Sequence, residues 1–484
     1  MANQDLSRLR STVTTVPQWQ CMESALRISR STLIRFPLAS PTSFVLIAAF
    51  AIRFSVAVTI AVTSDGTLFP DDDGYLTMAG RFASGDTENW DEFGTWGLWN
   101  NNAGFLLPIG ILFRLFGFHP LLGQTLSVLA GAITAAAVTA LVHRHTSATA
   151  ALCAGLSVAV FPSQILWSSL VLKDSFSWMA LTLLAVILGW WAQKTSILNY
   201  AIGFLALSCL MFFLVHLRSH TFTTVCIAAI ITLVSTAKSQ RTAKVVAVML
   251  LLAVLPLTVN AGIFSRTTFA ATGHLGGIRS NMAAHARTAI GAPSQVEEAR
   301  EIARPEEARE IARLEEALKE ALKEAREIAR PEEAIATSAP SAVADLLYLP
   351  TGLRVMLLDP LPNHLDKSSN MKYAFAEHLL WYPLLLLGLI GMVVRRKSLT
   401  PEIVFTLLVT GGLTTMWALV EGNFGTAYRH RGELVWGVAV LAGIGLDHLL
   451  NNRRPYSRDR KQDSLGRQSG DTQQSSGMGM PPAP

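Results

Sequence analysis

The chain alternates long apolar runs with short polar segments, and the lengths of the runs indicate its architecture. A helix that crosses a bilayer needs about 20 mainly apolar residues, and we expect about ten spans, within a range of about nine to twelve. The segment 103–119 is apolar but short, and Pro108 and Arg114 interrupt it, which predicts an interfacial or re-entrant helix. The pattern therefore predicts an all-α, polytopic transmembrane helix bundle. The expected spans are 42–63, 120–142, 147–163, 176–193, 199–217, 221–237, 243–262, 379–394, 402–420 and 434–450.

Composition supports the same class of protein. Half of the residues are hydrophobic and only 15% are charged, whereas a soluble chain of this length would need far more polar surface. The four cysteines, at positions 21, 153, 209 and 226, have no spacing that predicts a disulfide framework or a metal site. We expect membrane lipid as the environment of the chain and no nucleic-acid partner.

The basic residues predict how the chain is oriented. If the N-terminus is inside, the inner loops are 143–146, Lys194, 238–244, 395–397 and 451–461, and every one of them carries basic residues. Short cytoplasmic loops are enriched in Lys and Arg. The outer loops then carry the acidic residues. The sequence predicts a multi-pass protein of the cell membrane with both termini in the cytoplasm.

The predicted domains follow from these spans. A basic cytoplasmic tail (1–41) precedes an N-terminal bundle (42–262), a long external loop (263–378), a group of C-terminal helices (379–450) and a disordered cytoplasmic tail (451–484). Inside the loop, "REIARPEEA" occurs at 300–308 and at 326–334. We interpret the charged segment 297–334 as a solvated helical repeat tolerated in a surface loop, in preference to a functional coiled-coil arm.

Acidic residues cluster directly after the first span. Asp71, Asp72 and Asp73 lie in "LFPDDDGYLTMAG", and Asp73 is also a candidate N-cap for the helix that follows. Three adjacent carboxylates repel one another unless a cation or a proton relieves the charge. Asp71 and Asp72 are candidate proton acceptors, and Asp72 and Asp73 are candidate ligands of a divalent metal, Mg²⁺ or Mn²⁺. Asp174 is a second outer acid.

Asp174 also has a simpler interpretation, as a helix N-cap that forms an ion pair with Lys173. Arg53 lies inside the first span, where a charge costs about 2.5–3.5 kcal/mol on insertion scales. Its side chain must therefore face a partner or a hydrophilic cavity.

Basic side chains gather before the last span, against the usual distribution of charge. Arg429, His430 and Arg431 lie in "EGNFGTAYRHRGELVW", and Arg218 and His220 lie at another predicted outer boundary. Guanidinium groups match phosphate oxygens in geometry and charge, so these residues predict a phosphate-binding site. Headgroup snorkelling is the alternative interpretation of Arg218.

The order of these motifs resembles the GT-C class of integral-membrane glycosyltransferases, which use polyprenyl-phosphate sugars. It is similar to the dolichyl-phosphate-mannose protein mannosyltransferases and to the lipid A aminoarabinose transferases. The resemblance rests on "PDDDGYLTMAGRFASG" after the first span, "GILFRLFGFHP", the small-residue span "VLAGAITAAAVTALVHRH" and the "KD" that opens another helix. It covers residues 42–190 well and 340–450 loosely.

The resemblance implies a GT-C-like fold and transfer of a sugar from a polyprenyl-phosphate donor to a glycan, lipid or protein acceptor at the outer face. It implies that Asp71 or Asp72 is the catalytic base, that Asp174 is a second acid of an outer cavity, and that Arg429 and Arg431 hold the donor phosphate. Candidate substrate-binding residues are Tyr75 and His220. Metal dependence varies across the class, and the external loop here lacks an obvious β-rich domain.

Three other functions fit parts of the sequence. A polysaccharide polymerase or O-antigen ligase would depend on Arg218, His220 and the long loop instead of the aspartates. A secondary transporter would contain two related halves, and no convincing duplication of spans is visible. A structural membrane scaffold would need none of these residues.

Overall fold

A computed structural model of the chain describes residues 40–86, 95–192, 196–235, 342–361, 374–421 and 424–451. Every regular element within these ranges is an α-helix, as the sequence predicts. The two terminal tails, the span expected at 243–262 and the repeat 297–334 lie outside the described residues. The helices are α2 (Pro41–Thr63), α3 (Pro70–Ser84), α4 (Thr95–Phe116), α5 (Pro120–His143), α6 (Ala148–Ala159), α7 (Pro162–Ser168), α8 (Lys173–Trp191), α9 (Ile197–Val215), α10 (Ser219–Ser235), α16 (Ala342–Leu357), α18 (His378–Arg395), α19 (Pro401–Val420) and α20 (Phe424–Asn451).

Seven helices in the described part of the chain are long and apolar enough to cross a membrane: α2, α5, α8, α9, α18, α19 and α20. The pair α6–α7, bent by 56°, raises the number to eight if it is counted as one span. The chain is therefore a multi-pass helical membrane protein. The predicted number of about ten is not reached, because α10 is only a shorter apolar helix and 243–262 lies outside the described ranges. Residues 103–116 of the segment predicted at 103–119 belong to α4.

Proline sets the start of several helices. Pro41, Pro70, Pro120, Pro162 and Pro401 each occupy the first helical position of α2, α3, α5, α7 and α19. A first-turn proline loses no hydrogen bond, since the first N–H groups of a helix have no intrahelical partner, and its fixed φ suits the helix. The polar segments between spans thus specify where the next helix begins.

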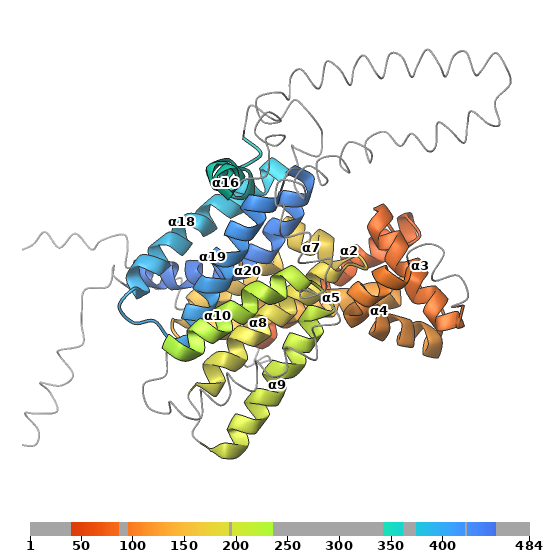
Figure 1. Ribbon diagram of the computed structural model, residues 1–484, viewed down its shortest axis with the longest axis horizontal. Helices are drawn as coiled ribbons and strands as arrows, with labels where there is room; N and C mark the ends of the chain where they lie inside the picture. The colour runs from red at the N-terminus through yellow and green to blue at the C-terminus, as the bar shows by residue number, and fades with distance from the viewer. Residues whose placement is uncertain are drawn as a thin grey trace, which may run out of the picture.

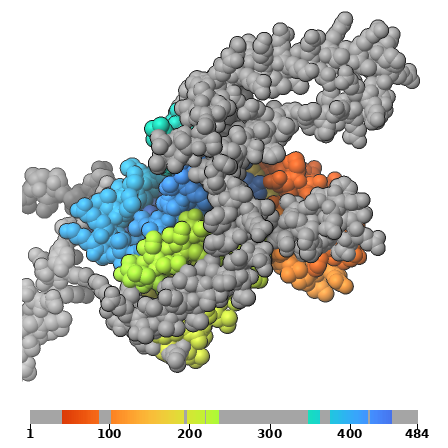
Figure 2. Space-filling model, viewed as in Figure 1, coloured from red at the N-terminus to blue at the C-terminus, as the bar shows by residue number. Residues whose placement is uncertain are grey.

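Helices α5, α8 and α20 form the interior of the bundle, and α2, α9 and α18 are more exposed at its edges (Figure 1). Helices α3 and α4 pack on each other at the opposite end of the molecule from α18 (Figures 1 and 2). Small side chains of α5 allow close approach. A Cβ added at Gly131 would lie 2.7 Å from Ser168 Cβ of α7.

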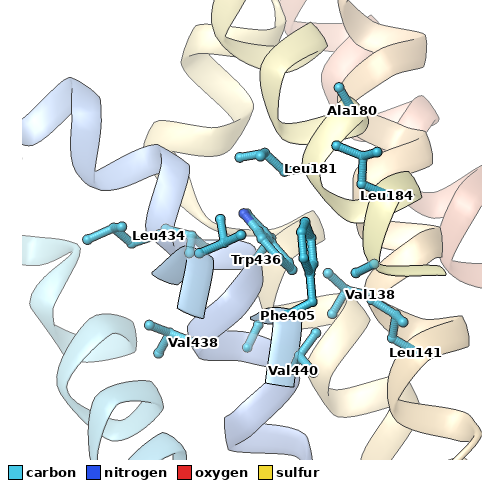
Figure 3. Close-up of a cluster of buried hydrophobic side chains, with 14 of the residues drawn as sticks. Val138, Leu141, Ala180, Leu181, Leu184, Phe405, Leu434, Trp436, Val438 and Val440 are labelled. Atoms are coloured by element: carbon cyan, nitrogen blue, oxygen red, sulfur yellow. The ribbon is translucent and has the colours of Figure 1, made fainter. Parts of the chain in front are cut away.

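The centre of the bundle is a packed apolar core. Figure 3 shows Trp436 of α20 and Phe405 of α19 lying between side chains of α5 and α8, among them Val138 and Leu184. All four residues are fully buried. The core joins the N-terminal helices to the C-terminal helices, so the two groups predicted from the sequence pack into one bundle.

Arg53 shows how the bundle accommodates a charge within an apolar helix. The side chain is fully buried and donates to the carbonyl oxygens of Val158 (3.0 Å) and Ala159 (2.9 Å) and to Ser168 Oγ (2.9 Å). Those carbonyls lie at the end of α6, where the turn into α7 leaves them without intrahelical partners. Arg53 therefore faces hydrogen-bond partners, as its position requires. Its N–H groups satisfy the carbonyl oxygens at the break between α6 and α7.

Contacts at the two ends of the bundle involve different charges. At one end, His145 Nε2 lies 2.7 Å from Glu402 Oε1, and Ser147 N donates to Asp447 Oδ1 at 2.9 Å. The opposite ends of α8 and α20 carry Asp174 and Arg429. The segments that the sequence assigns to the inner and outer sides thus gather at separate ends of the bundle. Which end faces the cytoplasm stays a prediction from the basic residues.

Helices α18 and α20 approach closely through glycine. A Cβ added at Gly391 would lie 2.0 Å from the carbonyl oxygen of Leu441, whereas nothing lies within 4 Å of one added at Gly411 on α19. We expect Gly391→Ala to lower the free energy of unfolding by about 1–3 kcal/mol through overpacking. Gly411→Ala should be neutral or stabilising, by up to about 1 kcal/mol. Thermal unfolding of the detergent-solubilised variants measures both, and equal stability would contradict the close packing of α18 on α20.

Candidate functional site

The first turn of α3 assigns different roles to the three adjacent aspartates. Asp72 is buried, and its carboxylate accepts hydrogen bonds from the backbone N–H groups of Leu68 (2.9 Å) and Phe69 (2.8 Å). Burial raises the pKa of Asp72, and these two amide donors oppose that rise. Because α3 begins at Pro70, the expected N-cap role of Asp73 is wrong, and Asp73 is an exposed first-turn residue.

Asp71, in the same turn, is exposed and pairs with a side chain of another helix. Its side chain is 58% exposed, and Oδ2 accepts a hydrogen bond of 2.6 Å from Arg429 Nη1 on α20. The pair joins segments that are 358 residues apart in sequence. Asp71 is thus the member of the triplet that meets the predicted phosphate-binding residues.

Asp174 lies on the other side of the Arg429 guanidinium. Arg429 Nε and Nη2 donate to Asp174 Oδ2 at 3.0 and 2.8 Å, a two-pronged contact. Asp174 is fully buried, and its second oxygen accepts from Arg218. The expected Lys173–Asp174 ion pair is wrong, because Lys173 Nζ donates to Asn102 Oδ1 at 3.1 Å and Asp174 pairs with the two arginines.

Arg218 continues the chain of charges into the bundle. Its Nη1 lies 3.0 Å from Glu433 Oε1, and both side chains are almost fully buried. Trp417 Nε1 donates to the other oxygen of Glu433 at 2.9 Å. We call Asp71, Asp174, Arg218, Arg429 and Glu433 the charge cluster.

The charge cluster draws on four parts of the fold. Its members come from the start of α3, the start of α8, the turn between α9 and α10, and the first turns of α20. Two arginines stand against three carboxylates, so the cluster is nearly neutral and can remain buried. Its exposed end is Asp71, beside Arg429, whose side chain is 18% exposed. This is where a solute can reach the charges.

Tyr75 lies beside the charge cluster, one helical turn from Asp71. The ring is buried and packs edge-on against Phe105 at 4.9 Å between centroids. Burial raises the pKa of Tyr75 to about 12, and the charges of Arg429 and Asp71 act on it with opposite signs. The phenol is therefore neutral at physiological pH and can donate a hydrogen bond.

His430 and His220 meet on the faces of one tryptophan. The His430 ring stacks on Trp417 at 3.6 Å, and its Nδ1 bonds to the buried carboxylate of Glu421. His220, at the start of α10, packs edge-on against the same tryptophan at 4.9 Å. Both histidines therefore contact Trp417, which also contacts the charge cluster through Glu433.

Arg431 faces away from the charge cluster. Arg431 is buried, and its guanidinium donates to the carbonyl oxygen of Met356 at 2.9 Å and lies 3.0 Å from His378 Nε2. Arg429 and Arg431 are two positions apart on one helix, about 200° around its axis, so they cannot face the same site. The sequence-based grouping of the two arginines into one phosphate site is therefore not reproduced by these contacts.

The predicted metal ligands are not brought together with further ligands. No group of three or more His, Cys, Asp or Glu side chains that could hold a metal ion is found among the described residues. Both oxygens of Asp72 face backbone N–H groups, a donor environment that competes with a cation. The aspartate triplet thus fits a metal site poorly, and metal dependence stays a prediction.

Glu433, Trp417 and the pairing of Glu421 with His430 are absent from the residues predicted from the sequence. One signal was available for Glu433. It follows Arg429 by four positions in a helix, so the two side chains share a face. The contacts of Arg218 and Trp417 depend on how distant helices rotate against one another, and no local pattern reports that.

Comparisons with known proteins add no assignment. No protein-family model matches the chain, and no curated protein sequence matches it at a significant level.

The contacts predict unequal costs for losing the two arginines of the charge cluster. Arg218→Met leaves the fully buried Glu433 without its cation, which should cost about 3–5 kcal/mol of stability, the usual loss when a buried pair is broken. Arg429→Met leaves Asp174 paired with Arg218 and frees only the exposed Asp71, so we expect less than half that loss. Equal midpoints of thermal unfolding in detergent for the two variants would contradict the assignment.

Proposed function

We propose that this chain is a membrane glycosyltransferase. It moves a sugar from a polyprenyl-phosphate donor to an acceptor hydroxyl at the end of the bundle that carries the charge cluster. The observation that carries the proposal is that Arg429 lies between Asp71 and Asp174. An arginine and an accessible carboxylate, from opposite ends of the sequence, lie side by side where the apolar helices end.

The first step of the reaction is exchange of partners at Arg429. The donor phosphate is a diester with one negative charge, and it competes with Asp71 for the guanidinium Nη1. Asp174 remains on the other edge and holds the guanidinium in place. Displacement from Arg429 frees the Asp71 carboxylate at the moment when the donor is bound.

The second step is transfer of the sugar. The acceptor oxygen attacks the anomeric carbon and forms the new C–O bond, while the bond from that carbon to the phosphate oxygen breaks. The phosphate leaves with the electron pair, stabilised by Arg429 and by His430. Asp71 takes the hydroxyl proton as general base. Attack opposite the leaving group inverts the configuration at the anomeric carbon.

The other predicted residues take supporting roles in this proposal. Asp72 fixes the first turn of α3, so that Asp71 is the base. Arg218 holds Asp174 and Glu433, and Arg431 joins α20 to α16 and α18. We assign Tyr75 to the substrate side of Asp71, as a neutral hydrogen-bond donor. Asp71, Arg429 and His430 are the groups that touch the reacting molecules.

Asp71→Asn tests the proposal most simply, because it keeps the shape of the side chain and removes the base. We expect release of polyprenyl phosphate from a panel of polyprenyl-phosphate sugars, measured with membranes that contain the protein, to fall by about 10²–10⁴-fold. Asp73→Asn is the matched control, since Asp73 is exposed two residues away, and it should retain activity.

Undiminished release by Asp71→Asn, at equal amounts of protein in the membrane, would refute the base. The same result together with inactivity of Arg218 and His220 variants would favour the polymerase or ligase function instead.

A further inference from the structure

An apolar groove of about 650 Å³ lies between α10 and α19. We call it the α10–α19 groove. One wall is formed by Thr224, Ala228 and Ile231 of α10, and the other by Gly412, Thr415 and Leu419 of α19. None of the described residues that line it is charged. A space with this lining suits hydrocarbon and does not suit a sugar or a peptide.

The groove opens to the outside of the bundle beside α10. Ile227 and Ile231, which line it on α10, are 56% and 44% exposed. In a membrane-spanning bundle such side chains contact lipid chains. A hydrocarbon chain of a lipid can therefore enter the groove sideways from the bilayer without crossing a polar region.

The polar end of the groove carries the two histidines. His220 precedes Thr224 by one helical turn, so it lies on the same face of α10 as the groove wall. Thr224 Oγ1 bonds to the carbonyl oxygen of His220. On the other wall, Val420 lines the groove and is followed directly by Glu421, which holds His430. The histidines therefore stand where the apolar lining ends.

From this arrangement we infer that the α10–α19 groove binds a polyprenyl monophosphate. The phosphate-proximal isoprene units lie between the helices and the phosphate lies at His220 and His430. The inference rests on the proposed function, because it locates the lipid of the donor. It adds a binding site whose walls are α10 and α19, neither of which carries the proposed base.

Ala228 and Gly412 carry a small side chain or none, which leaves space between α10 and α19. A second groove of about 660 Å³ adjoins α16, α18 and α19, but the basic residue in its lining, Arg354, already faces Asp359 at 3.8 Å.

Binding of sugar-free undecaprenyl phosphate to the full-length protein in nanodiscs tests the inference. Ile227→Trp places a large ring in the groove and should weaken binding by about tenfold or more, as should the His220→Ala/His430→Ala pair. Leu386→Trp is the matched control, because Leu386 is 62% exposed on α18 and lines neither groove, and it should bind as the unaltered chain does. Undecaprenol without phosphate should bind more weakly.

Three results would overturn the inference. The first is binding that Ile227→Trp leaves unchanged, and a loss in Leu389→Trp would then locate the lipid in the second groove. The second is equal competition by phosphatidylglycerol, which would show a site for ordinary membrane lipid. The third is no binding of undecaprenyl phosphate at all.

The assay separates this inference from the proposed function. If undecaprenyl phosphate binding depends on Ile227 and the two histidines but the protein transfers no sugar, the groove is a lipid-binding site and the transferase function is refuted. If sugar transfer requires Asp71, and Ile227→Trp changes neither transfer nor lipid binding, the proposed transferase is supported and the lipid site in the groove is refuted.

Discussion

Two carboxylates buried at one end of an apolar bundle determine how that end is built. Asp174 and Glu433 are fully buried, and a carboxylate so placed must be paired or give up its charge. Arg218 lies between them and contacts both. Arg429 supplies a second cation to Asp174. These ion pairs join the ends of α8 and α20 to the turn before α10.

The same constraint produces an accessible site. Arg429 has more donors than Asp174 can use, and the spare Nη1 points to Asp71, where the cluster reaches the surface. An exposed ion pair contributes only about 0–1 kcal/mol, so a competing anion can replace Asp71 at little cost to the fold. Stability thus resides in the buried half of the cluster, while exchange of partners is possible in the exposed half. That division is what transfer from a phosphate-linked donor requires.

The sequence is sufficient for a multi-pass helical bundle, though not for the number of spans, and for most of the charged residues of the charge cluster. The lengths of the apolar runs and the placement of charged residues specify these features locally. It is insufficient for roles that depend on helix rotation. In the sequence alone, Asp71, Asp72 and Asp73 are equivalent. Because α3 begins at Pro70, Asp72 caps the helix, Asp71 forms an exposed ion pair with Arg429, and Asp73 is exposed to solvent. The same limit applies to Arg431, although its two-residue offset from Arg429 already places it on the opposite face of the helix.

The competition between Asp71 and a phosphate for Arg429 is the central claim, and the affinity of undecaprenyl phosphate for Asp71→Asn tests it most directly. A neutral amide competes less well than a carboxylate for the guanidinium. The account therefore predicts that this variant, although its transfer activity is lowered, binds undecaprenyl phosphate more tightly than the unaltered chain does. Unchanged or weaker binding by Asp71→Asn would contradict it.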